Sequence, residues 1–385
     1  MRIRSRVLGG TALVLALALS GCSGSSDAGG SGDEGVSEEA QAIVDAAKQE
    51  IDSYKEVPSS DDLGEPIDVS SLKGETIFSI PIDARNEFYQ ESEPAMAKIA
   101  EKAGVKYTTF PADGTQTSYQ QGFAQAIAQD ASVILLNGPL PETLEPQIKE
   151  ATEAGIPVVP LHLSDSEEEP LEATPYEAFA PFNLGARLST LYAVQDLKGE
   201  PVKALVIEVS STGPSDGMVK TIEDVLANEA PEGSEISEKI NSQVSDWSTE
   251  VQGAVQSALL KDPEINAVIP IYDSIALFAI PGIQQAEGDR NIGVYSFNGT
   301  TSVLGILDDG VMRVNVAENP DWVSYVNLDT AFRAMLDSGP SDKASGPVRV
   351  IDKSNLSELG DPPVAGKGFG DEYQGAFLAM WGIEE

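Results

Sequence analysis

Aromatic and amide side chains stand at several positions where a short apolar run gives way to polar residues. Phe88, Tyr89 and Trp247 carry flat rings that can cover the C–H face of a sugar or of another ring. Asn86 and Asn298 can donate and accept hydrogen bonds at the same time, which suits hydroxyl groups. Together these residues favour non-covalent recognition of a small ligand. Packing in a hydrophobic core is the alternative interpretation of the three aromatic residues.

Four more residues at predicted strand ends are candidates for contact with the same ligand: Asn137, His162, Tyr272 and Asp273. Because histidine changes charge near neutral pH, a cleft position for His162 would make binding pH-sensitive, and a purely structural histidine is the alternative. Asp273 can instead cap the helix that follows Tyr272. Asn298 precedes a Gly-Thr pair, so a turn or a helix cap competes with ligand contact there.

The composition restricts the chemistry open to the chain. One histidine and one cysteine occur in 385 residues, so a Cys/His zinc site is excluded and a catalytic triad would have to use His162. Cys22 alone permits no internal disulfide. The acidic run 165–169 lacks the spacing of a calcium loop and is interpreted as a solvated loop. The glycine-rich run 366–370 lacks phosphate-loop spacing, and we expect no nucleotide, metal or other cofactor.

The chain is strongly acidic, with a formal net charge of −38 at pH 7. Such a field repels nucleic acid and anionic lipid, so neither is expected as a partner. It also disfavours anionic small ligands unless a local basic group, such as Arg85, pairs with their negative charge. The acidic surface is interpreted mainly as a source of solubility.

The elements that must position these residues alternate between strand and helix. Strands are predicted near 76–82, 105–110, 131–136 and 156–162, with helices near 87–103, 116–129 and 142–154. After a helix near 184–197, strands are predicted near 202–209, 235–241, 265–272, 291–297 and 311–317, with helices near 215–229, 247–260, 274–286 and 301–308. A helix near 319–338, a strand near 348–351 and an apolar docking segment at 377–383 complete the chain. The pattern predicts two similar α/β domains of the doubly wound, Rossmann-like kind, with a ligand cleft between the carboxyl edges of their parallel sheets.

The N-terminal residues have the features of an export signal. Three arginines precede an apolar run, 7–19, that is too short to span a bilayer. The run ends in Leu19-Ser20-Gly21-Cys22, which resembles the lipobox of bacterial lipoproteins and makes Cys22 the expected lipidation site. An ordinary signal peptide with a chance cysteine is the alternative. The helical pattern at 36–54 predicts a helix that either packs on the body or extends the stalk.

Between about residues 75 and 351 the chain resembles the sugar-type, ribose-binding-protein-like periplasmic binding proteins of ABC importers, which have the type 1 fold. Four segments carry the resemblance: EFYQESEPAMAKIAEKAGV, ILLNGPLPETLEPQIKEATEAGIPVVPL, PEINAVIPIYDSIALFAI and GVYSFNGT. The last two are the most specific. The family usually has an acidic residue before a helix in one of them and an Asp/Asn-Gly-Thr turn after a strand in the other.

The resemblance implies a hinge with three crossings, near Phe182, Glu318 and Pro347, and ligand capture by closure of two lobes. The family's ligand positions fall on the following residues: Asn86, Phe88, Tyr89, Trp247, Tyr272 with Asp273, Asn298 in place of an aspartate, and Glu318 in place of the hinge glutamine.

Two departures from the family bear on the ligand. The Asp-Arg pair that binds sugar hydroxyls at the fourth strand end is replaced by His162-Leu163, and residues 211–218 contain no basic side chain that could serve as the second-domain arginine. Because the guanidinium fork suits paired hydroxyls, a ribose-like pentose is not expected. A less polar ligand, or one that donates hydrogen bonds to Glu318, fits better.

These observations predict a solute-binding lipoprotein that catalyses no reaction. It is expected to be a monomer, anchored outside the cytoplasm to the cell membrane by Cys22, that captures a small neutral or polyhydroxylated ligand, such as a sugar or polyol, for an ABC permease and ATPase. A ligand-sensing lipoprotein that signals to a membrane receptor is the alternative, and no motif supports a hydrolase. The expected parts are a signal peptide (1–21), a lipidated flexible linker (22–35), a helix and connector (36–72), an N-terminal lobe (73–182 and 319–346), a C-terminal lobe (183–318 and 347–370) and a tail (371–385).

Overall fold

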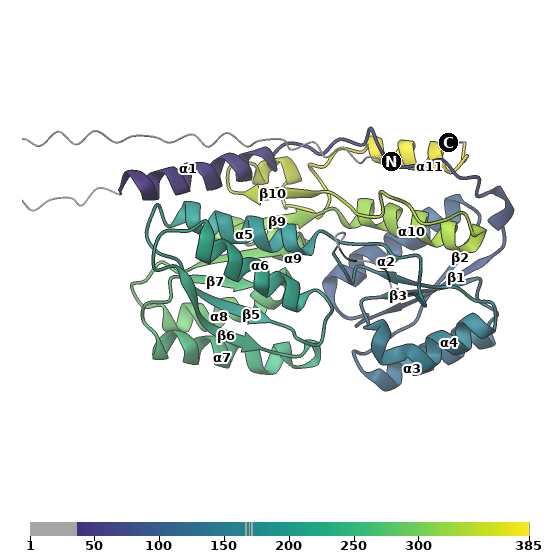
Figure 1. Cartoon of the computed structure of the whole chain (residues 1–385), viewed down its shortest axis with the longest axis horizontal. Helices are drawn as coiled ribbons and strands as arrows, with labels where there is room; N and C mark the ends of the chain where they lie inside the picture. The colour runs from purple at the N-terminus through teal and green to yellow at the C-terminus, as the bar shows by residue number, and fades with distance from the viewer. Residues whose placement is uncertain (1–36, 166–167, 169, 171, 385) are drawn as a thin grey trace, which may run out of the picture. The chain divides into compact units, whose positions relative to one another are not determined.

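Two separate sheets of mainly parallel strands organise the fold (Figure 1). The structure, a computed structural model, describes residues 37–165, 168, 170 and 172–384. The expected signal peptide (1–21) and the expected linker (22–35), with Cys22, lie outside these residues. The two sheets confirm the predicted α/β fold with two lobes.

The N lobe is built on a four-stranded parallel sheet in the order β2-β1-β3-β4. Its strands are β1 (Thr76–Pro81), β2 (Lys106–Thr109), β3 (Val133–Asn137) and β4 (Val158–Leu161). Helices α2 (Glu87–Lys102) and α10 (Pro320–Leu336) cover one face, and α3 (Gln116–Ala128) and α4 (Glu145–Glu153) cover the other. The strands are buried on both faces, which is why β1 and β3 are apolar almost without interruption.

The C lobe is built on a six-stranded sheet in the order β10-β9-β8-β7-β5-β6. Its strands are β5 (Lys203–Glu208), β6 (Glu235–Asn241), β7 (Ala267–Pro270), β8 (Gly293–Asn298), β9 (Met312–Glu318) and β10 (Val348–Asp352). Only β10 is antiparallel to its neighbour, β9. The helices of this lobe are α5 (Phe182–Asp196), α6 (Ser215–Asn228), α7 (Trp247–Lys261), α8 (Asp273–Ala286) and the short α9 (Thr301–Leu304).

Both sheets reverse their winding at equivalent positions, between β1 and β3 in the N lobe and between β5 and β7 in the C lobe. In an open α/β sheet, ligands bind outside the carboxyl ends of the strands at such a point. The loops after these strands are therefore where the topology favours a binding site.

The chain passes between the two sheets three times: before α5, between β9 and α10, and between α10 and β10. Two of these passages lie side by side, because Phe179 pairs with Ser345 and its backbone N–H donates to the Ala344 carbonyl at 2.7 Å. These are the places where the family resemblance implies hinge crossings.

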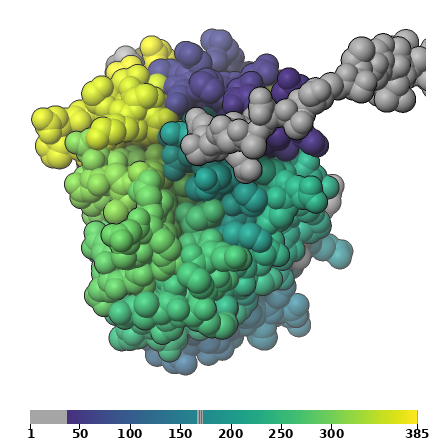
Figure 2. All heavy atoms as spheres, turned by 90° about the vertical axis from the view of Figure 1, so that its left-hand side faces the viewer, coloured from purple at the N-terminus to yellow at the C-terminus, as the bar shows by residue number. Residues whose placement is uncertain are grey.

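The ends of the described chain pack on different lobes. Helix α1 (Glu38–Ser53) lies on α5, and its Ala47 and Ile51 join the core of the C lobe. The stalk interpretation of this helix is therefore wrong. Helix α11 (Glu372–Met380) and Trp381 join the N-lobe core, so the C-terminal segment does dock on the body. Figures 1 and 2 show both end segments, purple and yellow, on the same side of the molecule.

Two predicted helices differ in detail from the structure. The helix expected at 142–154 begins as a 3-10 turn, Pro141–Leu144, because Pro146 fits the first turn of α4 and not a helix interior. The helix expected at 301–308 ends at Leu304, and a 3-10 turn, Leu307–Asp309, leads to Gly310 with a left-handed φ of 88°. No helix in the described part of the chain is long and apolar enough to cross a membrane.

Candidate functional site: a pocket between the lobes

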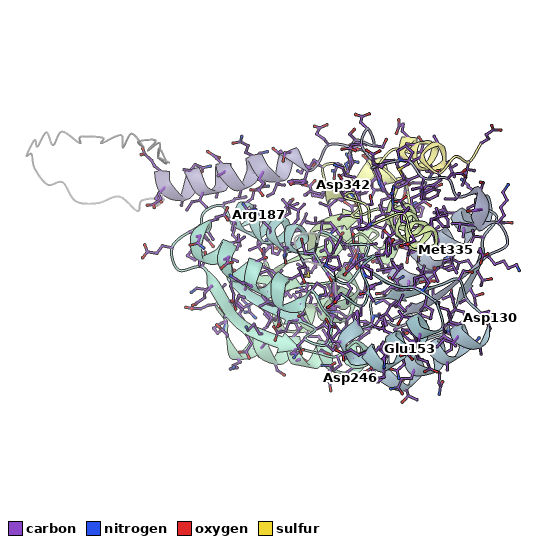
Figure 3. All side chains as sticks on the ribbon, turned by 45° about the vertical axis from the view of Figure 1, so that its right-hand side comes forward. Asp130, Glu153, Arg187, Asp246, Met335 and Asp342 are labelled. Atoms are coloured by element: carbon purple, nitrogen blue, oxygen red, sulfur yellow. The ribbon has the colours of Figure 1, made fainter. Side chains whose placement is uncertain are left out.

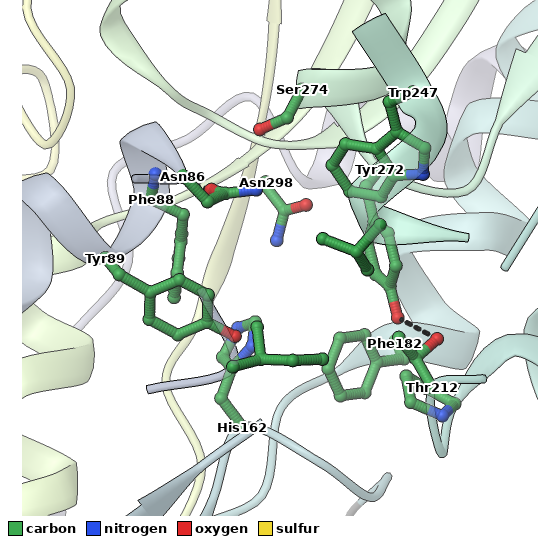
Figure 4. A pocket seen from close by; sticks show the side chains of 13 residues that line it. Asn86, Phe88, Tyr89, His162, Phe182, Thr212, Trp247, Tyr272, Ser274 and Asn298 are labelled. Carbon is green, nitrogen blue, oxygen red and sulfur yellow. Dashed lines mark hydrogen bonds between the residues drawn. The ribbon is translucent and has the colours of Figure 1, made fainter. Parts of the chain in front are cut away.

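A small hollow of about 50 Å³ lies where the carboxyl ends of the two sheets face each other (Figure 4). Its walls come from loops after β1, β4, β5, β6, β7 and β8 and from the start of α5. The lining residues are Ile82, Asn86, Phe88, Tyr89, His162, Phe182, Thr212, Pro214, Val244, Trp247, Tyr272, Ser274 and Asn298.

The N-lobe wall is formed by the first turn of α2. Asn86 is the N-cap of this helix, and its side-chain oxygen accepts from the Phe88 N–H at 3.0 Å. Phe88 and Tyr89 meet edge to face, with ring centroids 5.4 Å apart. The Tyr89 hydroxyl packs against Gly138, where a β-carbon would lie 2.5 Å from the hydroxyl oxygen and φ is 101°, so glycine is required at that position.

His162, which lines the pocket, pairs with Glu318, which is buried behind it. The His162 Nε2 lies 2.8 Å from a Glu318 carboxylate oxygen, and the same oxygen accepts from the Asn298 side-chain amide at 3.3 Å. The imidazole ring also packs between Phe88 and Phe182, with centroid distances of 4.5 and 4.9 Å. One N-lobe side chain is thus tied to a strand end of the C lobe.

The C-lobe wall carries Trp247, Tyr272 and Thr212. Trp247 opens α7 and donates its indole N–H to the Ser242 carbonyl at 3.2 Å. The Tyr272 and Thr212 hydroxyl oxygens are 3.0 Å apart, drawn as the dashed contact in Figure 4. Burial raises the pKa of the Tyr272 hydroxyl, so the phenol is neutral at physiological pH. This wall offers flat rings and neutral polar groups.

Seven of the ten candidate residues line the pocket: Asn86, Phe88, Tyr89, His162, Trp247, Tyr272 and Asn298. Asn137, Asp273 and Glu318 do not, and are instead fully buried behind it. Asn137 donates to the Glu93 carboxylate at 2.9 Å. Glu318 presents its oxygen to His162 and Asn298 and not to the hollow.

Asp273 neither lines the pocket nor acts as the helix cap that was the alternative. Tyr272 is the N-cap residue of α8, and Asp273 is the first residue of the helix. Its carboxylate accepts from the Gly299 and Thr300 N–H groups at 2.9 and 2.8 Å, which holds the turn after β8. Burial raises the pKa of Asp273 to about 7, although these hydrogen bonds oppose the shift.

The pocket is lined by apolar, aromatic, hydroxyl and amide side chains and by one imidazole. Among the described residues, none of the lining side chains belongs to Lys, Arg, Asp or Glu. Arg85, the basic group that could have answered an anion, lies in a neighbouring hollow and is paired with Asp83 through two hydrogen bonds of 2.9 and 2.6 Å. The arrangement suits a neutral ligand.

Six lining residues were not predicted from the sequence: Ile82, Phe182, Thr212, Pro214, Val244 and Ser274. The sequence indicates Phe182 only as a hinge position, and in the loop that contains Thr212 it indicates only that no basic residue is present. A search of every predicted strand end for hydroxyl and apolar side chains would have found Ile82, Thr212 and Ser274.

Comparison with known proteins agrees with this geometry. A family model described as "Periplasmic binding protein domain" matches residues 77–338. The ribose import binding protein of Escherichia coli (strain K12) is 21% identical over 292 residues, which cover 74% of this chain and 93% of that protein.

Solved structures show the same fold. A sugar ABC transporter protein from Yersinia enterocolitica subsp. enterocolitica 8081 superposes with a TM-score of 0.66 at 20% identity, covering 82% of this chain and 96% of its own. A carbohydrate transporter from Acidothermus cellulolyticus 11B, in complex with myo-inositol, gives a TM-score of 0.63 at 20% identity, covering 77% and 99%. The match over residues 77–338 shows that the chain belongs to the periplasmic binding protein family.

Proposed function

We propose that this protein is the solute-binding lipoprotein of an ABC importer and captures a small, neutral, polyhydroxylated ligand between its lobes. The observation that carries the proposal is the pocket lining, in which rings from both lobes surround neutral amide and hydroxyl groups without a fixed charge. Rings bind the C–H faces of a sugar or polyol, while the polar groups bind its hydroxyls.

The ligand is proposed to contact the seven candidate residues that line the pocket. Asn137, Asp273 and Glu318 are proposed to support them from behind. A ribose-like pentose is not the expected ligand, because His162-Leu163 replaces the family's Asp-Arg pair. The myo-inositol bound by one structural neighbour makes cyclic polyols a chemical class to test first.

Closure is proposed to occur about the three passages between the lobes, with boundaries at 182/183, 318/319 and 346/347. The buried His162–Glu318 contact and the aromatic residues of both lobes can come together only when the lobes face each other. Closure excludes water from the ligand and presents one shape to a membrane partner.

A thermal-shift screen of sugars, polyols, nucleosides and small aromatic compounds tests the binding function. A ligand that binds only the native state, at a free concentration of 100 times its Kd, adds about 2.7 kcal/mol to the free energy of unfolding. A true ligand therefore raises Tm. Calorimetric titration of each hit then gives Kd. If only anionic or nucleoside compounds raised Tm, the proposal of a neutral polyol-like ligand would be wrong.

The anchor is proposed to be a lipid on Cys22, with the protein outside the cytoplasm as a monomer. The expected result is that the wild-type chain fractionates with membranes and incorporates labelled palmitate, while Cys22→Ala does neither. Retention of the label by Cys22→Ala would exclude the lipobox interpretation.

Import and sensing can be separated by reconstitution. When reconstituted with the permease and ATPase of the importer, the ligand-loaded protein is expected to stimulate ATP hydrolysis and ligand uptake in vesicles. Unchanged ATP hydrolysis, together with ligand-dependent binding to a receptor or kinase, would support the sensing alternative.

A further inference from the structure

The hydrogen bonds inside the C-lobe wall fix the direction in which its hydroxyl protons point. Thr212 has a single hydroxyl proton, and its Oγ1 donates this proton to the Val209 carbonyl at 2.8 Å. A carbonyl oxygen cannot donate, so the direction of this bond is unambiguous. Because the contact with the carbonyl is the shorter of the two, we assign the Thr212 proton to it, and the tyrosine is then the donor in the 3.0 Å contact between Thr212 and Tyr272.

As a result, Tyr272 can offer a ligand only the lone pairs of its oxygen. The high pKa that burial gives the phenol keeps the proton in place at physiological pH. Asn298 is oriented in a similar way. Its amide nitrogen donates to the Glu318 carboxylate at 3.3 Å, because the amide oxygen would be repelled there. The Asn298 oxygen is therefore left free to accept.

The opposite wall has the complementary polarity. The Asn86 side-chain oxygen is occupied by the Phe88 N–H at 3.0 Å, which leaves the amide nitrogen of Asn86 as the free end. Figure 4 shows Asn86, Asn298 and Tyr272 around the same hollow. Asn86 thus offers a donor from the N-lobe wall, and Tyr272 and Asn298 offer acceptors from the C-lobe wall. A hydroxyl group is the neutral group that can accept from one and donate to the other.

Building on the proposed function, we infer that Thr212 is a positioning residue that determines specificity. By holding the Tyr272 proton, it makes the pocket require a ligand hydroxyl that donates to Tyr272. An ether, ketone, fluorine or carboxylate in place of this hydroxyl would place its own lone pairs against those of the Tyr272 oxygen in a buried site. This repulsion weakens binding by about 10-fold or more. The ligand class is thus a neutral polyol with a free hydroxyl on the face toward β5 and β7.

The test compares hydroxyl with fluorine, since the two are similar in size but only the hydroxyl donates. The mature chain is titrated calorimetrically with myo-inositol, D-glucose, D-allose and erythritol. Each monodeoxy-monofluoro derivative of the tightest of these probes is then titrated in turn. The expected result for the wild type is one ring position at which fluorine weakens binding by at least 10-fold.

Thr212→Val removes the acceptor for the Tyr272 proton while keeping the shape of the side chain. The Thr212 N–H also donates to the Val209 carbonyl, at 2.9 Å, so that carbonyl stays paired in the variant. The freed Tyr272 hydroxyl can turn its proton toward fluorine, so the penalty at that position is expected to fall below about 3-fold. Thr212→Ser keeps the hydroxyl and should retain the wild-type penalty.

Thr221→Val is the matched control, because Thr221 donates to the Gly217 carbonyl within α6 and is not among the lining residues. Thr221→Val should leave the ratio of hydroxyl-ligand affinity to fluorine-derivative affinity unchanged at every ring position. Tyr272→Phe provides a second route that does not depend on the folding of Thr212→Val. It should weaken binding of the parent ligand and abolish the fluorine penalty.

The outcomes separate this inference from the proposed function. If neither these four probes nor any sugar or polyol of the thermal-shift screen bound the wild type, the proposed function itself would be overturned, and this inference with it. If a probe bound, but the hydroxyl-to-fluorine ratio were the same in the wild type, Thr212→Val and Tyr272→Phe, only the specificity role of Thr212 would be overturned.

Discussion

At the level of single residues, His162 and Asn298 have positive backbone φ angles, which residues other than glycine rarely adopt. Their φ values are 53° and 129°, and both side chains hydrogen-bond to Glu318. Such strain persists where surrounding contacts fix the conformation, and it is concentrated at functional sites. The fold therefore tolerates a backbone cost that keeps these two side chains at the pocket.

Asn298→Gly should separate the role of this side chain from that of its backbone. Glycine adopts φ near 129° without strain, so Tm should stay close to that of the wild type. Ligand affinity should fall at least 10-fold, because the buried hydrogen bond between the Asn298 side chain and the ligand is lost. Asn298→Ala should lose the same affinity and have a lower Tm than Asn298→Gly, since it keeps the strained β-carbon that glycine lacks. Calorimetric titration measures the affinity, and thermal unfolding measures Tm. Wild-type affinity in Asn298→Gly would mean that the Asn298 side chain does not contact the ligand.

The raised pKa of the Glu177 carboxyl group predicts that the free energy of unfolding depends on pH. It is 4% exposed, its carboxylate accepts from the Ser164 hydroxyl, and burial raises its pKa from 4.5 to about 7. The native carboxyl therefore keeps its proton at pH values where the unfolded chain has released it. Its contribution to the free energy of unfolding is complete below pH 4.5 and is lost as the pH rises through 7.

Glu177→Gln should remove this dependence. Between pH 4.5 and 8 the free energy of unfolding of the wild type should fall relative to the variant by about 3 kcal/mol, as measured by urea unfolding at several pH values. Glu153→Gln, at a side chain 67% exposed, should follow the wild-type curve. Parallel curves for Glu177→Gln and the wild type would show that Glu177 is not the responsible group.

At the level of elements, α1 is held to the C lobe by packing and by one arginine. Arg187 on α5, labelled in Figure 3, donates to both oxygens of Glu50 on α1, at 2.7 and 2.8 Å. It also donates to both oxygens of Glu229, at 2.6 and 2.8 Å. Forked contacts of this kind orient a helix better than a single surface ion pair does. The helix is therefore part of the lobe, although it precedes the two-lobe body in sequence.

Arg187→Met should loosen α1 without unfolding the lobe. The variant keeps the packing of Ala47 and Ile51 but leaves two carboxylates unpaired, so a loss of about 1 kcal/mol is expected. Hydrogen exchange should quicken in α1 before it does in α5. Lys48→Met is the control, since Lys48 pairs only with Asp52 on the same helix and is 55% exposed, and it should change neither measurement. Unchanged exchange in α1 of Arg187→Met would mean that packing alone holds the helix.

The sequence predicts elements better than it predicts the direction of side chains. Strands such as β3 and β5 were predicted within about two residues, because continuous apolar runs bounded by turn residues leave few alternatives. Asp273 could not be assigned in this way, because its partners lie at Gly299 and Thr300, beyond any local pattern. Trp247 lines the pocket and also belongs to the C-lobe core, so Trp247→Ala should reduce stability as well as binding. Its two roles depend on packing that spacing does not encode.

At the level of the whole molecule, carboxylates of α2 reach from the N lobe to the turn at the start of α9. Glu87 accepts from the Ser302 N–H at 3.0 Å and from its hydroxyl at 2.8 Å, and Glu91 accepts from the Thr301 N–H at 3.2 Å. Burial raises the pKa of Glu91, which is only partly offset by this contact. These bonds can exist only while the two lobes face each other, so any opening of the lobes must break them.

Glu87→Ala should therefore weaken ligand binding without touching the ligand. Glu87 is not among the residues that line the pocket, but its loss removes two bonds that favour the closed arrangement. Since apparent affinity depends on the population of the binding-competent state, Kd should rise by about 3- to 10-fold. Small-angle scattering should show a larger mean radius of gyration at subsaturating ligand. Gln90→Ala, at an exposed position of the same helix, should match the wild type in both measurements. A Glu87→Ala variant with wild-type Kd and wild-type compaction would mean that the contact between α2 and α9 does not contribute to closure, and that the hinge and the pocket alone determine it.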